Sequence, residues 1–512
     1  MFTSPAVSLD HLFEFDVDEG DLRIADRCEE TLVERGGVLD EMVTRVEIEH
    51  PYALYRADVG KAQLANFFLP HAGKDGDQGE PEFLVAKDIG LDFGTTNTVA
   101  ALADGTGGSE LIEFQSKQAS GATFRSALCF WEDSGVPGSV DSEAGPWAIE
   151  EFLETPSDCR FVQSFKSVVA SPSFERALIF NRPFRFEDMG RLFLGKLVSR
   201  AQGRLDQRPR RVIVGRPVEY AGAQPDSDLA RERYRAMFAD FGVEVHYVYE
   251  PLGAAFSYAT RLTEPATVLV ADFGGGTTDF SIVRIADAGA TQRCTPLASS
   301  GIGIAGDRFD QRIVDRLVLP MLGKGGQYRS FDKLLDIPGG WFADFSDWSR
   351  LALMRNRRTL DELRRLQRNA VDPAAIGRLI ALIEHEQGYP LYAAVGQLKR
   401  ALSNETSAQF QFNGGGLEIA VEVERAAFEE WIAPDLSRIE QALDYALMRA
   451  GIAAEQIDRV FLTGGSSLIP AVRRLFDRRF GTDRIASGGE LTSIAHGLAM
   501  IGALPEPALW AA

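Results

Sequence analysis

The chain has 512 residues, which is more than one compact core usually holds, so two or more domains are expected. Its composition is 45% hydrophobic and 25% charged, as in soluble globular proteins, and its net charge of −20 argues against general binding to nucleic acid or to anionic membranes. The four cysteines are widely spaced and form no CxxC pair, so neither a disulfide framework nor a thiolate zinc site is expected. The sequence has no basic leader and no run of about 18 apolar residues, which predicts a cytoplasmic location with proteins or small molecules as partners.

Residues 1–84 form an N-terminal extension to which the residue pattern assigns no role. The extension ends in HAGKDGDQGEPE (residues 71–82), a glycine- and acid-rich stretch that is typical of a linker or loop. Its DGD lacks the spacing and the closing glutamate of an EF-hand, so we expect a solvated loop there.

Residues 85–285 alternate short apolar runs with amphipathic segments, which predicts a mixed α/β architecture. The run RRVIVGRPVEY from Arg210 is expected to be a buried strand that ends at a glycine-proline turn. The segment RERYRAMFADFG from Arg231 is expected to be an amphipathic helix that stops at glycine.

Residues 286–405 are expected to be mostly helical from residue 311 onward and to include an arginine-rich insert. Leu360, Leu363 and Leu366 would share one face of a helix there. The arginines would form a solvated face, with a docking patch for a partner as the alternative; they are Arg350, Arg355, Arg357, Arg358, Arg364, Arg365 and Arg368. In residues 406–512, the segment from Ala408 to Glu424 predicts a β-hairpin, followed by a long helix to about Ala450.

Three glycine-rich segments, each opening on a short apolar run, carry the chemistry: GLDFGTTNT from Gly90, ADFGGGTTDF from Ala271 and FLTGGSSLIP from Phe461. The first two are near copies, with an aspartate at the strand end, then glycine, then a threonine pair. Glycine permits a tight turn and lets backbone N–H groups approach phosphate oxygens, while threonine adds donors and aspartate can hold hydrated Mg²⁺. Two such hairpins facing each other would clamp a polyphosphate, and their similarity suggests an internal duplication. The pattern is neither a P-loop nor a dinucleotide-binding fingerprint.

In this order, the three motifs resemble the actin-like ATPase superfamily, and most closely the nucleotide-binding domain of the heat-shock protein 70 chaperones. The resemblance covers about 420 residues, from roughly 85 to 505. EPLGAAFSYA from Glu250 is similar to the family's connecting helix, and IGIAGDRFD from Ile302 is similar to its turn into the second lobe. QLKRALS from Gln397 is similar to the family's adenine-side helix, and QSFKSVV from Gln163 is similar to its stretch with a catalytic lysine. The resemblance implies two duplicated ribonuclease-H-like lobes around a nucleotide cleft, with a helical insert.

The resemblance also implies the roles of individual residues in binding ATP or ADP with Mg²⁺. Asp92, Asp272 and Glu250 would contact Mg²⁺ through water, and Lys166 would orient the attacking water or stabilise the γ-phosphate. Thr277 would bond a phosphate oxygen, and Asp279 would help to hold the water network. The remaining residues expected to contact the nucleotide are Gly94, Thr95, Thr96, Asn97, Gly274, Gly275, Gly276, Gly306, Lys399, Arg400, Ser403, Gly464, Gly465 and Ser466. Hydrolysis at such a site depends mainly on positioning and electrostatics.

The sequence departs from the full-length family pattern in three respects. The resemblance stops near residue 505, so we do not expect the peptide-binding β-domain, the helical lid or the linker before them. Leu491 stands where the family usually has an acidic residue, so one adenosine-side contact is not carried over. The chain is most similar to the short, YegD-type branch, with an unusual N-terminal extension and an enlarged insert.

The leading hypothesis is therefore an ATP-hydrolysing, chaperone-like protein whose lobes open and close with nucleotide state and whose partner is a protein or an unfolded client. An actin-like filament-forming ATPase, a sugar-type kinase with a general base beside the acceptor hydroxyl, and a nucleotide sensor without turnover are the alternatives.

Overall fold

In this computed structural model, side chains are described for residues 87–511 except 118, 133–138, 157, 206–208, 223, 240–242, 287–293, 346–353, 487 and 490. Of the first 86 residues, only the backbone of 23–35, 38–50 and 53–60 is described. The linker expected at residues 71–82 and Arg350 lie outside the described residues. The chain divides into two compact units, residues 1–85 and 86–512.

The described part of the first unit is a three-stranded antiparallel sheet. It consists of β1 (Arg23–Arg35), β2 (Val38–His50) and β3 (Ala53–Gly60), in the order β1-β2-β3. The middle strand, β2, therefore pairs with both of its neighbours in the sequence.

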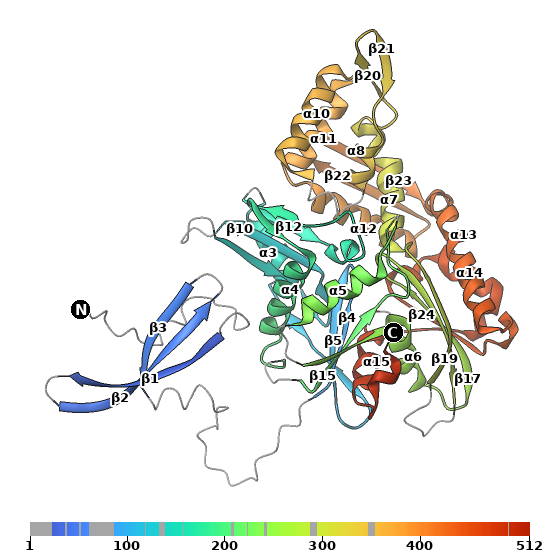
Figure 1. Ribbon diagram of the computed structural model, residues 1–512. Coiled ribbons are helices and arrows are strands. Elements are labelled where there is room, and N and C mark those ends of the chain that lie inside the picture. The colour runs from blue at the N-terminus through green and yellow to red at the C-terminus, as the bar shows by residue number, and fades with distance from the viewer. Residues whose placement is uncertain are drawn as a thin grey trace. The chain divides into compact units, whose positions relative to one another are not determined.

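Two mixed sheets organise the second unit (Figure 1). The first has the order β16-β15-β4-β5-β6 and the second the order β19-β18-β17-β24-β25. In each sheet, a central strand (β4 or β17) pairs antiparallel with the next strand in the chain and parallel with a later strand. We call the halves built on these sheets the first lobe and the second lobe. The strands are β4 (Ile89–Phe93), β5 (Asn97–Ala103), β6 (Ser109–Leu111), β15 (Arg211–Arg216), β16 (Glu244–Tyr249), β17 (Ala266–Phe273), β18 (Thr278–Ile285), β19 (Cys294–Ile302), β24 (Arg459–Thr463) and β25 (Ile485–Ser487).

Further elements complete each lobe around its own apolar core. In the first lobe they are β9 (Phe124–Arg125), which pairs with β5, a sheet of β10 (Ala127–Glu132), β11 (Val140–Ala144) and β12 (Cys159–Gln163), the short pairs β7 (Phe114–Gln115) with β8 (Ser120–Gly121) and β13 (Ala177–Ile179) with β14 (Arg182–Phe184), and the helices α3 (Gly145–Glu154), η2 (Phe165–Val168), α4 (Phe186–Arg200) and α5 (Ser227–Phe238). In the second lobe they are α7 (Gly306–Leu317), η4 (Leu319–Leu322), β20 (Gln327–Ser330), β21 (Lys333–Asp336), α8 (Gly340–Ser346), α10 (Arg357–Asn369), α11 (Pro373–Glu384), α12 (Gly388–Asn404), β22 (Ser407–Gly414), β23 (Leu417–Glu424), α13 (Arg425–Ala450), η5 (Ala454–Gln456), η6 (Gly465–Leu468), α14 (Pro470–Phe480) and η7 (Thr482–Arg484).

Two helices, α6 (Glu250–Ala259) and α15 (Ser493–Gly502), cross each other between the lobes; η8 (Pro507–Trp510) follows α15. They cross closely because both carry glycine at the contact: a Cβ on Gly497 would lie 1.7 Å from the carbonyl oxygen of Gly253. Their side chains share a core with Ile213 and Val248 of the first lobe and Val268 and Val270 of the second. The crossing therefore joins the two lobes through a small, tightly packed contact.

The structure confirms the mixed α/β architecture and the local elements expected from the sequence. The predicted strand from Arg210 is β15, the predicted helix from Arg231 lies in α5, and the predicted hairpin and long helix are β22–β23 and α13. Helix α5 begins where the Asp226 side chain accepts hydrogen bonds from the N–H groups of Asp228 and Leu229, as N-cap residues do.

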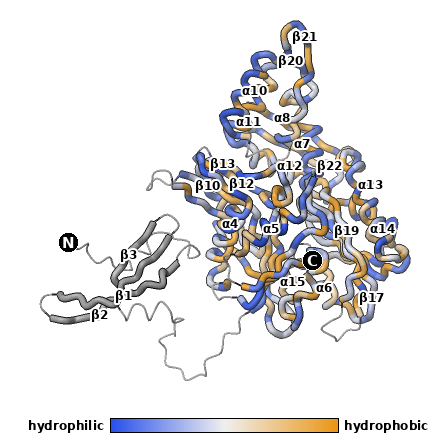
Figure 2. Tube along the Cα trace, in the orientation of Figure 1, coloured by the Kyte–Doolittle hydropathy of each residue, from blue (hydrophilic) through white to orange (hydrophobic). Residues whose placement is uncertain are grey.

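The insert (β20, β21, α8, α10 and α11) is helical as expected except for one hairpin, β20–β21, that the sequence did not predict. Leu363 of α10 is buried, and Leu360 and Leu366 pack against the same core, while hydrophilic residues predominate along the rest of α10 (Figure 2). Among the described residues, no helix is both long enough and apolar enough to span a membrane.

Candidate active site

The first and second glycine-rich segments form the turns of two β-hairpins, β4–β5 and β17–β18. The first turn requires glycine at position 94, because a Cβ there would lie 2.3 Å from the carbonyl oxygen of Asn97. In the second turn, the N–H of Gly274 donates a hydrogen bond of 3.0 Å to the carbonyl oxygen of Thr277. Both segments therefore fold locally as tight turns at the ends of buried strands.

The two turns face each other across the interface between the lobes. A Cβ on Gly275 would lie 2.3 Å from Oγ1 of Thr96, and a Cβ on Gly276 would lie 3.2 Å from Oγ1 of Thr95. The hydroxyl groups of Thr95 and Thr96 in the first lobe therefore lie next to the glycine backbone of the second lobe. Hydroxyl and N–H donors from both lobes thus lie close together.

A buried ion pair lies beside these turns. Lys166, in η2, donates a hydrogen bond from Nζ to Oε1 of Glu250, the first residue of α6, at 2.6 Å. The two side chains are only 6% and 7% exposed, and Nζ also lies 5.8 Å from the centre of the Phe93 ring. The pair joins the first lobe to the crossing helix.

Three further carboxyl groups lie in this environment: Asp272 and Asp279 are buried, and Asp92 is half-buried. Burial and the nearby charge of Glu250 raise the pKa of Asp92 to about 8, although Lys166 opposes the shift. Burial, Glu250 and Asp92 raise the pKa of Asp272 well above its ordinary value. Burial and Glu250 raise the pKa of Asp279 to about 7, against hydrogen bonds from Thr277 and from the N–H groups of Val218 and Glu219.

These shifts have a common cause, which is more buried negative charge than one lysine neutralises. Burial alone would lower the pKa of Lys166, but Glu250, Tyr234 and Asp92 outweigh it and raise that pKa. A divalent cation would relieve the remaining repulsion, so the donor set fits Mg²⁺. Among the described residues, no three His, Cys, Asp or Glu side chains lie close enough together to ligate a metal directly. The expected contacts run through water, so they remain a prediction.

The third glycine-rich segment begins in β24, and its turn packs against the end of β17. Gly464 has a φ of 79°, and a Cβ on it would lie 2.1 Å from the carbonyl oxygen of Phe273. At the neighbouring Gly465, a Cβ would have no atom within 4 Å. The segment therefore combines one position that only glycine fits with open space beside it.

Several residues expected to contact the nucleotide are brought together from α12, α7 and η6. Lys399 of α12 donates from Nζ to the carbonyl oxygen of Gly306 at 3.1 Å and to Oδ2 of Asp310 at 2.8 Å. A Cβ on Gly306 would lie 2.6 Å from Oγ of Ser466. Arg400 is exposed on α12, and the Ser403 hydroxyl donates to the carbonyl oxygen of Lys399 within the helix.

The sequence analysis missed Arg125 and Ser126, which flank the first turn. Ser126 donates from Oγ to the carbonyl oxygen of Gly94 at 2.7 Å and from its N–H to that of Thr96 at 3.0 Å. Arg125 pairs with Asn97 in the sheet, and its Nη1 donates to Oδ1 of Asn97 at 3.5 Å. The sequence holds one weak signal for them, a polar pair directly before the apolar run ALCFW.

A further contact between the lobes is centred on Glu386. Glu386 Oε1 accepts hydrogen bonds from Nη1 of Arg160 in the first lobe at 2.7 Å and from Nη1 of Arg355 in the second lobe at 2.6 Å. The ring of Tyr389 packs between Phe152 and Phe161 of the first lobe, with centroids 5.7 and 5.2 Å away. We call Arg160, Arg355 and Glu386 the interlobe clasp.

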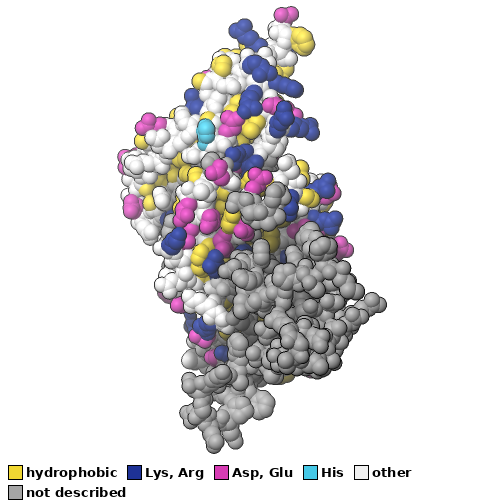
Figure 3. Space-filling view, turned by 90° about the vertical axis from the view of Figure 1, so that its left-hand side faces the viewer, with side chains coloured by type: hydrophobic (Ala, Val, Ile, Leu, Met, Phe, Trp, Pro, Cys, Tyr) yellow, Lys and Arg dark blue, Asp and Glu magenta, His cyan; other side chains and the backbone are white. Residues whose placement is uncertain are grey.

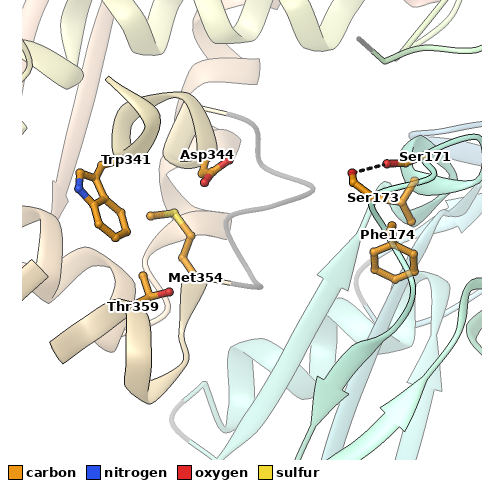
Figure 4. Close-up of a pocket in the computed structure, with 8 residues that line it drawn as sticks. Ser171, Ser173, Phe174, Trp341, Asp344, Met354 and Thr359 are labelled. Atoms are coloured by element: carbon orange, nitrogen blue, oxygen red, sulfur yellow. Dashed lines mark hydrogen bonds between the residues drawn. The ribbon is translucent and has the colours of Figure 1, made fainter. Parts of the chain in front are cut away.

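A cavity of about 280 Å³ opens between the segment that follows Lys166 and the insert (Figure 4). Its lining consists of Val168, Ser171, Ser173 and Phe174 from the first lobe and Trp341, Asp344, Met354 and Thr359 from the insert. The cavity therefore lies where a movement of the lobes would change its width.

Comparison with known proteins finds similarity to one protein family and its members. The family model described as Hsp70 protein matches residues 179–326 and 386–509. Chaperone protein DnaK of Deinococcus proteolyticus is 24% identical over 435 residues, which are 81% of this chain and 59% of that protein. The chain thus spans about three fifths of the length of this curated relative.

Proposed function

The chain belongs to the Hsp70 family, and from this premise we propose that it binds and hydrolyses Mg-ATP between its two lobes as a chaperone-like ATPase. The observation that carries the proposal is the meeting of the two turns, Thr95 and Thr96 against Gly275 and Gly276, beside the Lys166–Glu250 pair. The shared strand order of the two sheets supports the finer proposal of an actin-like fold with duplicated, ribonuclease-H-like lobes.

In the proposed mechanism, the backbone N–H groups and threonine hydroxyls of both turns bind the phosphate oxygens. Mg²⁺, held through water by Asp92, Asp272 and Glu250, would neutralise charge on the phosphates. Lys166 is held charged by Glu250 and supplies a fixed positive charge for the transferring phosphoryl group. Asp279 is fixed by the N–H groups of Val218 and Glu219 and orients water at the edge of the site.

Nucleotide state would control the lobes because each turn belongs to a different lobe. A γ-phosphate that binds both turns favours the closed arrangement, and hydrolysis removes that difference in binding. On the adenosine side, Lys399, Arg400, Ser403, Gly306 and Ser466 would hold the nucleoside, with Gly464 and Gly465 passing beneath it. The proposed partner is an unfolded client or a dedicated protein.

The test is Mg²⁺-dependent ATP hydrolysis by the purified chain, alone and with an unfolded protein, with Asp272→Asn as the blank. We expect turnover in the wild type and none in the variant. Turnover that appears only when a sugar is added would support a kinase, and nucleotide-dependent light scattering would support a filament. Tight ATP binding without turnover would support a nucleotide sensor and contradict the proposed ATPase.

A further inference from the structure

The family match breaks between residues 326 and 386, and the insert falls in this gap. The elements β20, β21, α8, α10 and α11 lie within residues 327–384. Surface features of the insert therefore lie outside the residues that the family model matches.

The hairpin β20–β21 presents apolar side chains to solvent. Phe331 is fully exposed, and Leu334, Leu335 and Val371 are 55%, 42% and 59% exposed. Ser330 pairs with Lys333, so Phe331 and Asp332 form a two-residue turn. Phe331 has a φ of 53°, a conformation for which such turns favour asparagine or glycine. A phenylalanine here costs local stability and gains no packing within the chain, which points to a contact with another molecule.

The helix beside the hairpin presents arginines. Arg357 and Arg358 are almost fully exposed and form ion pairs with Asp361 and Glu362 of their own helix. Arg365 and Arg368 are also exposed, and no ion pair to either is found among the described residues. Because the whole chain carries a net charge of −20, this basic surface is opposite in sign to the rest of the protein.

The hairpin and the helix are fixed to each other. Tyr328 of β20 forms a β-bridge with Ala370, which directly follows α10, and the N–H of Val371 donates to the carbonyl oxygen of Gln327 at 2.8 Å. This places the apolar hairpin at the end of α10 that carries Arg365 and Arg368. In Figure 3, Lys and Arg side chains gather at this end of the molecule near an exposed hydrophobic side chain.

We propose that this surface, formed by Phe331, Leu334 and Val371 together with Arg365 and Arg368, is a docking site for an acidic protein segment that carries apolar side chains. Apolar groups at the centre and arginines beside them are the combination that protein interfaces favour. The exposed Leu334 and Phe331 side chains would contribute nothing to binding a nucleic-acid backbone, whereas they would be buried against the apolar side chains of a protein segment. The inference does not rest on ATP hydrolysis, because the docking surface is built from the insert alone.

The experiment measures fluorescence anisotropy of a labelled peptide in which Leu and Phe alternate with Glu and Asp, added to the full chain. The two test variants are Phe331→Ser/Leu334→Ser and Arg365→Glu/Arg368→Glu. The matched control is Arg438→Glu/Arg478→Glu, which makes the same charge change at exposed positions of α13 and α14. We expect saturable binding that weakens about tenfold in each test variant and less than about twofold in the control.

Two further measurements separate the other possible occupants. A peptide with Lys in place of the acidic residues should not bind, and neither should a labelled DNA duplex. Tighter binding of the duplex than of the acidic peptide would overturn the proposal in favour of nucleic acid. Sedimentation that shows self-association of the wild type, lost in Phe331→Ser/Leu334→Ser, would overturn it in favour of a second copy of the chain. Equal peptide binding by the wild type and both test variants would also refute it.

Discussion

Arg160 and Glu386 join the two lobes through a hydrogen bond of 2.7 Å between Nη1 and Oε1, although 226 positions separate them in the chain. Both side chains are largely buried, so the pair is less screened than an exposed one. Because the proposed nucleotide lies between the same lobes, this contact must open before the lobes can move apart. The interlobe clasp is therefore expected to slow nucleotide release, which is a rate that can be measured.

Arg160→Ala should accelerate nucleotide release about tenfold, since a charge-assisted hydrogen bond is worth about 1.5–3 kcal/mol and part of that loss appears in the opening rate. The measurement is stopped-flow release of a fluorescent ADP analogue. Lys117→Ala, which removes an exposed first-lobe ion pair with Glu154, is the control and should leave the rate unchanged. An unchanged rate in Arg160→Ala would show that opening does not involve the clasp.

Lys166→Ala should reduce stability by about 3–5 kcal/mol, because it leaves the buried carboxylate of Glu250 without its cation. The double variant Lys166→Met/Glu250→Gln removes both charges and should recover most of that loss. Neither variant should hydrolyse ATP if Lys166 acts on the phosphate. Denaturant unfolding measures the first effect and turnover the second. Normal turnover in the double variant would leave the pair a purely structural role.

The sequence predicted the parts of the site that depend on local pattern. Gly94, Gly275 and the threonine pairs could be predicted to form tight turns, because such turns demand those residue types within a few positions. Their contacts with phosphate remain a prediction. Arg125 could not be assigned, because no motif connects it to Asn97, its partner in the sheet.

The same limit explains the other omissions. The clasp depends on residues more than 190 positions apart, and no local pattern predicts such a contact. The hairpin β20–β21 lacks the Asn-Gly signal of a two-residue turn, so its sequence, QYRSFDKLLD, did not identify it.

The raised pKa values of Asp92 and Asp279 predict that the nucleotide-free protein loses stability as pH rises. In the folded protein the pKa of Asp92 is about 8 and that of Asp279 is about 7, against an ordinary value of 3.8 for both. Between about pH 4 and its own pKa, each group keeps a proton in the folded state that it releases in the unfolded state. The free energy of unfolding should therefore fall by up to about 1.4 kcal/mol per pH unit for each group and level off above pH 8. Asp92→Asn should flatten this slope when unfolding is measured from pH 5 to 8. An identical slope in wild type and variant would show that Asp92 has an ordinary pKa.

Gly464→Ala should destabilise the protein and abolish nucleotide binding. The new Cβ would overlap the carbonyl oxygen of Phe273, and the φ of 79° is strained for alanine, at a cost of at least about 1–3 kcal/mol. Gly465→Ala is the matched control, because its Cβ meets no atom within 4 Å, so it should fold like the wild type. Thermal unfolding and ATP titration of the two variants provide the comparison. Equal melting temperatures would contradict the backbone contact between Gly464 and Phe273.

Arg125 should contribute to binding the phosphates rather than the nucleoside. It lies opposite Asn97 beside the first turn, and its Nη1 donates to Oδ1 of Asn97 at 3.5 Å. Burial lowers the pKa of Arg125, while Tyr389, Asp307 and Asp310 of the second lobe oppose that shift. Arg125→Ala should weaken ATP binding about tenfold and leave AMP binding within about twofold, while Arg182→Ala, at an exposed first-lobe position, should change neither. Titration calorimetry with ATP and AMP measures both constants. Equal losses for the two nucleotides would assign Arg125 to supporting the fold of the cleft, because only a contact with the outer phosphates separates ATP from AMP.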